Sequence, residues 1–76
     1  MSIRLDADKV LDARDRLGLS QEDLARRTGM SPVTIARAEH GEPIRPISAR
    51  RLARGLNLKV EDLYTPRGEG VALTTK

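Results

Sequence analysis

The sequence predicts a small all-α domain built from five short helices. The core has to be assembled from Leu, Ile, Val and Ala, because the 76 residues include one aromatic side chain, that of Tyr64. A sheet would favour aromatic and β-branched residues. Apolar residues also recur at helical spacing, and glycines or prolines interrupt these runs at short intervals. Each interruption is expected to end one helix before the next begins.

The first two helices are predicted from the residues that can cap their ends. Asp6 or Asp8 can accept hydrogen bonds at the start of the first helix, and Gly18 can end it. Ser20 can cap the second helix, and Asp23 stands three residues later, where a capping box has its acidic partner.

The third helix is predicted over Pro32–His40, between two glycines. Ser31 is its N-cap, and Pro at the first helical position is tolerated because that N–H has no helical partner. Gly29 ends the preceding helix, and Gly41 stops this one.

The C-terminal half is expected to hold the last two helices. One runs from about Ile47 to Leu56, and a shorter one lies within "NLKVEDLY" at residues 57–64. The segment "EPIRP" at residues 42–46 is expected to be a loop, because its two prolines break any regular ladder.

The two ends of the chain carry short apolar segments that allow two interpretations. After residue 66 the composition changes to "RGEGVALTTK", a tail at residues 67–76 that is either disordered or a short strand. Its "VALTT" can pair with "SIRL" at residues 2–5, within one chain or across a dimer. The alternative is that both ends are frayed.

Composition excludes several function classes. The absence of cysteine excludes disulfides, thiolate zinc sites and thiol catalysis. His40 is the single histidine, so neither a transition-metal site nor any other cofactor is expected. No nucleophile stands near a base in motif spacing, and no glycine loop has the phosphate-binding pattern, so we do not expect an enzyme. No apolar run reaches membrane-spanning length, so we expect no membrane association and an intracellular protein.

Charge gives a mild indication of an anionic partner. Fourteen basic and 11 acidic residues leave a net charge of +3. The segment from Arg45 to Arg54 contains arginines and no acid. Arginine suits bidentate contacts to phosphates and guanines, although a solvated surface is the preferred explanation for such a run taken alone.

The spacing of small residues in the second and third helices is that of a helix-turn-helix. Two helices that cross steeply need a small residue at the crossing and a glycine in the turn. Ala25, Gly29 and Ile35 stand at the positions that a DNA-binding helix-turn-helix requires.

The stretch "LSQEDLARRTGMSPVTIARAEHGEPIRPISARRLARGLNLKVEDLY" resembles the Cro and phage-repressor family of helix-turn-helix proteins, also called the xenobiotic-response-element type. The resemblance covers roughly residues 10–64. It implies a five-helix lambda-repressor-like DNA-binding domain, which we assign to residues 1–66. It also implies a sequence-specific transcriptional regulator of the cytoplasm and nucleoid, a repressor that binds an inverted repeat in double-stranded DNA as a homodimer.

The resemblance assigns DNA contacts to individual residues. The helix Pro32–His40 would enter the major groove and meet base edges through Ser31, Pro32, Val33, Thr34 and Arg37. Many relatives carry Gln at positions 32 and 33, so direct hydrogen-bond readout is expected to be sparser here. Phosphate contacts are implied for Ser20, Gln21, His40, Gly41, Arg45 and Arg50. Arg50 has an equally plausible role in keeping its helix face soluble.

The resemblance also implies a structural ion pair and protein partners. Arg14 and Glu39 lie on otherwise apolar faces, where a charge needs a partner, and relatives pair these positions. The homodimer surface is expected around the fourth and fifth helices, with the candidates Ile47, Leu56, Asn57, Leu58 and Tyr64. The alternative function is an antitoxin that binds a toxin protein, through residues 67–76, and regulates its own operon.

Overall fold

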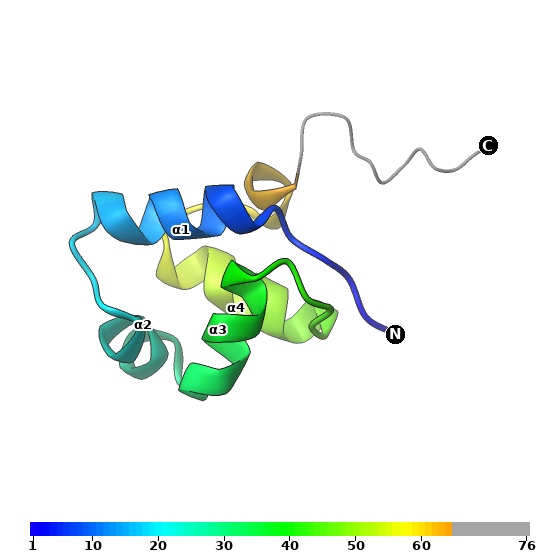
Figure 1. Cartoon of the computed structure of the whole chain (residues 1–76), viewed down its shortest axis with the longest axis horizontal. Helices are drawn as coiled ribbons and strands as arrows, with labels where there is room; N and C mark the ends of the chain where they lie inside the picture. Colours follow the sequence, from blue (N-terminus) through cyan, green and yellow to red (C-terminus); the bar gives the residue numbers. More distant parts are fainter. Residues whose placement is uncertain (65–76) are drawn as a thin grey trace.

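The structure is a computed structural model that describes residues 1–64. Within this part of the chain the elements are α1 (Ala7–Arg16), α2 (Gln21–Thr28), α3 (Pro32–Glu39), α4 (Pro46–Gly55) and the 3₁₀ helix η1 (Val60–Leu63). Residues 1–64 form no strand, so the predicted all-α class is confirmed. The chain folds into a small bundle in which α1 packs against α3, α4 packs against α2, and α2 leads through a tight turn into α3 (Figure 1).

The predicted count of five helices is not confirmed. The fifth element is one 3₁₀ turn, Val60–Leu63, in place of a helix within residues 57–64. Asn57 adopts a left-handed backbone with φ of 62°, and the Leu58 N–H bonds back to the Ala53 carbonyl at 2.8 Å. This bonding ends α4, and the residues that follow form the 3₁₀ turn.

The predicted caps form at the helix ends. Asp6 caps α1, because its Oδ1 accepts hydrogen bonds from the N–H groups of Asp8 and Lys9 at 3.0 and 3.2 Å. This resolves the choice between Asp6 and Asp8. Gly29, the C-cap of α2, and Gly41, which follows the C-cap residue of α3, adopt left-handed backbones with φ of 73° and 71°. These helix ends are therefore set by local capping residues that can be identified in the sequence.

One apolar core joins all the elements. Its fully buried side chains include Leu24 of α2, Ile35 of α3 and Leu52 of α4. The core consists of Leu5, Val10, Leu24, Ala25, Ile35, Ala38, Ile44, Ala49, Leu52, Ala53, Leu56 and Leu63. It contains no aromatic residue, as the composition predicted, so α3 is held by aliphatic packing against α1 and α2.

The N-terminal segment is anchored to the loop before α4. The Ile3 and Ile44 backbones exchange two hydrogen bonds of 2.8 Å in an antiparallel bridge, and Leu5 is buried. The interpretation of this end as frayed is therefore wrong. The "EPIRP" loop was expected to form no ladder, yet Ile44 makes this single bridge because it lies between the two prolines and keeps its N–H. The predicted partner "VALTT" and the tail at residues 67–76 lie outside the described residues.

Gly55 marks the closest approach of α4 to α2. A Cβ built at Gly55 would overlap the Cγ2 methyl of Thr28. Thr28 cannot turn away without loss, because its hydroxyl donates to the Leu24 carbonyl at 2.8 Å. Arg27 Nε donates to the Gly55 carbonyl at 2.6 Å and so satisfies the end of α4. The two helices thus need a residue without a side chain at position 55.

We predict that Gly55→Ala destabilises the protein by about 1–2 kcal/mol, because overpacking at the Thr28 methyl outweighs the higher helix propensity of Ala. Urea unfolding measures the change. The double variant Gly55→Ala with Thr28→Ser removes the clashing methyl and is expected to recover stability relative to Gly55→Ala. A single variant more stable than the wild type would contradict the close packing.

Candidate nucleic-acid interface

The α2–turn–α3 unit presents α3 with one buried and one exposed side. Ile35 and Ala38 are fully buried, whereas Val33 keeps 63% of its surface exposed. Pro32 and Arg37 are also exposed. Exposed Pro32 and Val33 side chains can contact apolar groups such as thymine methyls.

The start of α3 is held by its own side chains. Ser31 Oγ accepts from the Thr34 N–H at 3.3 Å, and the two hydroxyls lie 3.2 Å apart. Ser31 is exposed and Thr34 is half-buried. Both predicted base-contacting hydroxyls therefore already take part in the helix cap, and each retains further hydrogen-bonding capacity.

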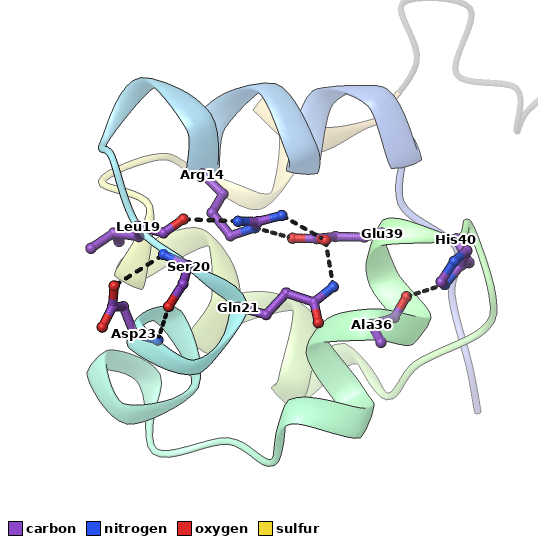
Figure 2. A network of polar contacts seen from close by, with 8 residues as sticks. All are labelled: Arg14, Leu19, Ser20, Gln21, Asp23, Ala36, Glu39 and His40. Atoms are coloured by element: carbon purple, nitrogen blue, oxygen red, sulfur yellow. Dashed lines mark hydrogen bonds and ion pairs between the residues drawn. The ribbon is translucent and has the colours of Figure 1, made fainter.

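Glu39 is held at the centre of a network that joins three helices (Figure 2). From α1, Arg14 Nε donates to Glu39 Oε2 at 2.5 Å and its second terminal nitrogen donates to Oε1 at 3.2 Å. From α2, Gln21 Nε2 donates to the same Oε1 at 2.8 Å. The remaining Arg14 nitrogen donates to the Leu19 carbonyl at 2.8 Å. The side chains of Arg14 and Glu39 are only 15% and 6% exposed.

The hydrogen bonds of this network offset the desolvation free energy of burying two charged groups. The hydrogen bond to Glu39 raises the pKa of Arg14. Partial burial of Arg14 acts in the opposite direction and is the smaller effect. Both carboxylate oxygens of Glu39 are bonded. Removing the carboxylate would leave the arginine half-buried and uncompensated.

The resemblance implies a phosphate contact for Gln21, and this contact stays a prediction. In the structure the Gln21 amide nitrogen donates to Glu39 Oε1, which joins the side chain to the interior network. Sequence reasoning missed this contact. A signal was available, because one arginine leaves spare acceptor capacity on a buried carboxylate, and a polar residue in the first turn of α2 can supply the additional donor.

The start of α2 is a closed capping box. Ser20 Oγ accepts from the Asp23 N–H, and Asp23 Oδ2 accepts from the Ser20 N–H, both at 3.0 Å (Figure 2). The backbone hydrogen bond from Ser20, with the one from its side chain, lowers the pKa of Asp23. The Ser20 N–H is therefore already bonded, and a phosphate contact from Ser20 would involve its hydroxyl.

The end of α3 leaves little backbone for a phosphate. The N–H groups of His40 and Gly41 bond to the carbonyls of Ala36 and Ala38 at 3.1 and 3.2 Å. His40 Nδ1 also pairs with the Ala36 carbonyl at 2.8 Å (Figure 2). Both N–H groups were expected to face a phosphate, and helix termination uses them instead. The imidazole Nε2 of His40 is the group that remains for such a contact.

Two arginines that the resemblance names as phosphate contacts, Arg45 and Arg50, lie in different parts of the surface. Arg45 lines a hollow of about 400 Å³ together with Arg37 of α3. Arg50 lines a separate groove of about 610 Å³ with Arg54, between α4 and η1. The structure thus brings Arg45, but not Arg50, to the edge of α3.

We predict that Glu39→Ala destabilises the protein by about 3 kcal/mol, the cost of breaking a buried pair from one side. Chemical unfolding gives the value. Arg16→Ala is the matched control, because its pair with Asp12 is exposed, and it should cost under about 1 kcal/mol. Equal effects of the two substitutions would contradict the structural role of Glu39.

We predict that the contribution of Asp23 to stability is lost in acid. Its pKa is lower in the folded protein, so the contribution is complete above the unfolded pKa of about 3.9 and disappears as the pH falls through the folded value. The measurement is the difference in unfolding free energy between wild type and Asp23→Asn from pH 7 to pH 2. A difference that stays constant over this range would contradict the capping-box geometry.

Within residues 1–64, no helix is long and apolar enough to cross a membrane. The same residues bring no three His, Cys, Asp or Glu side chains together in a group that could hold a metal ion.

Comparison with known proteins agrees with this arrangement. Two solved structures have a similar fold: apo-HppE, with a TM-score of 0.70 and 27% identity, and FeII HppE in complex with substrate, with 0.70 and 26%. They match 91% and 92% of this chain, which spans only 41% and 44% of theirs. No curated protein matches. A family model described as helix-turn-helix matches residues 10–63, which include every element from within α1 to the end of η1. The chain therefore belongs to the Cro and phage-repressor type of helix-turn-helix family, and a domain of this type indicates a DNA-binding transcription regulator.

Proposed function

We propose that this protein is a sequence-specific repressor that binds an inverted-repeat operator as a homodimer, with α3 in the major groove. The observation that carries the proposal is the exposed side of α3, where Val33 and Arg37 face outward while the opposite side is fixed in the core. A helix held rigidly on one side can present the other to base edges with defined geometry.

Arg37 is the proposed hydrogen-bonding reader. It is exposed and makes no ion pair with any carboxylate of residues 1–64, so its guanidinium is available for O6 and N7 of a guanine. Pro32 and Val33 make apolar contacts, which suits thymine methyls. Ser31 and Thr34 add contacts through hydroxyls that are already oriented by the helix cap.

The backbone contacts are proposed on both sides of α3. On the α2 side, the Ser20 hydroxyl and the start of α2 near Gln21 are available. On the other side are Arg45 and, after α3, the imidazole of His40 beside Gly41. Arg50 lies in the groove between α4 and η1, so we assign it to a phosphate that flanks the half-site.

Two recognition helices are needed because one short helix reads few base pairs. Leu56 was a candidate for the dimer surface, but it is 3% exposed and belongs to the core. Ile47 and Leu58, 48% and 36% exposed, remain as apolar candidates for this surface. Such a regulator acts in the cytoplasm, where the DNA of a nucleoid is accessible.

We predict that Arg37→Ala abolishes preference for one base pair in each half-site, a loss of about 1–3 kcal/mol in discrimination. Sites are first selected from a random DNA pool, and binding is then compared by electrophoretic shift. Arg54→Ala, with the same loss of charge outside α3, should retain the preference. Equal effects of the two substitutions would indicate non-specific charge binding, and selected sites without two-fold symmetry would contradict the homodimer.

A further inference from the structure

We infer that the first turn of α3 recognises the C5-methyl group of a pyrimidine and not the rest of its base edge, so that 5-methylcytosine substitutes for thymine in the bound DNA. This inference rests on the proposed function and deepens it, because it extends the bases that α3 reads to a modified one. It follows that methylation of a cytosine at this position of an operator raises the affinity of the protein.

Pro32 and Val33 form an apolar surface at the start of α3. Val33 keeps 63% of its surface exposed, Pro32 is exposed too, and neither belongs to the core cluster. Neither side chain has a hydrogen-bond donor or acceptor, and Pro32 has no backbone N–H. The apolar group that a base edge presents in the major groove is the methyl on C5 of the pyrimidine. We assign this methyl contact to Val33, with Pro32 beside it.

The two hydroxyls beside this surface do not distinguish the two methylated pyrimidines. Next to C5, thymine presents the acceptor O4, and cytosine presents the donor N4. Ser31 Oγ and Thr34 Oγ1 lie 3.2 Å apart, and either hydroxyl can donate to the other, while Ser31 Oγ also accepts from the Thr34 N–H. In both directions of the hydroxyl bond the pair keeps one free proton and at least one free lone pair. It can therefore bond to O4 or to N4.

No side chain of this turn is limited to donating or to accepting. Residues 31–34 are Ser, Pro, Val and Thr, without an amide, a carboxylate or a guanidinium. Arg37 only donates, but it lies four residues after Val33. Four residues of α-helix rise about 6 Å, whereas neighbouring base pairs are about 3.4 Å apart, so Arg37 reads a different base pair. At the position that Val33 contacts, recognition depends on the methyl group.

The test begins with a DNA site selected from a random pool. Each thymine of the half-site is replaced in turn by uracil, which lacks the methyl, by 5-methylcytosine, which keeps it and changes the C4 group, and by cytosine, which changes both. At one position uracil and cytosine are expected to lower affinity about fourfold, as for one methyl group removed from an apolar contact. At that position 5-methylcytosine is expected to bind like thymine.

Val33→Ala tests which side chain is responsible. Alanine removes two methyl groups from the surface and suits an exposed helix position, so the variant is expected to fold, which a melting curve checks. It should bind the thymine and uracil sites equally and still require the guanine that Arg37 reads. Leu11→Ala is the matched control, because Leu11 is 41% exposed and belongs to α1. It should keep the full dependence on the methyl group.

Three results would overturn the inference and leave the proposed function standing, provided that Arg37→Ala loses its guanine preference. The first is uracil bound as tightly as thymine at every position. The second is rejection of 5-methylcytosine as strong as that of cytosine, which would show that the C4 group is read. The third is a methyl dependence that Val33→Ala leaves unchanged. A random pool from which no sequence is enriched would instead contradict the proposed function.

Discussion

The carboxylate of Glu39 is the point on which the arrangement of the helices depends. It accepts hydrogen bonds from Arg14 of α1 and Gln21 of α2, while its own backbone ends α3. Aliphatic packing is non-directional, so a core of Leu, Ile, Val and Ala tolerates small rotations between short helices. A buried carboxylate with three directional bonds does not, because each rotation would leave a charge or a donor unsatisfied.

This constraint determines how α3 is presented. The recognition helix is short, and its buried side offers only a few aliphatic contacts. The Glu39 network fixes its last turn and the Ser31 cap fixes its first. The exposed residues between these two points, Val33 and Arg37 among them, therefore acquire a defined position without contacting the network. Under the proposed function, affinity for DNA and stability of the fold would be coupled through this one helix.

The N-terminal segment and α4 extend the surface beyond the helix-turn-helix. The bridge between Ile3 and Ile44 closes the loop after α3 and stabilises the hollow that Arg45 lines. Gly55 lets the end of α4 approach α2 closely. Elements that appear peripheral in sequence thus complete the polar surface that borders the recognition helix.

The sequence by itself determined where the first three helices begin and that the core is aliphatic. The caps at Asp6, Ser20 and Ser31 and the turn at Gly29 act over a few residues, so their chemistry is legible in the chain. The Arg14–Glu39 pair was also accessible, because opposite charges on two apolar faces must meet. Only the tertiary structure decided that Gln21 bonds to Glu39 and that Ile3 pairs with Ile44. It also decided that Arg45 and Arg50 line different hollows. These outcomes depend on how the helices dock, since the groups involved are 18 or more residues apart or lie on different sides of one helix.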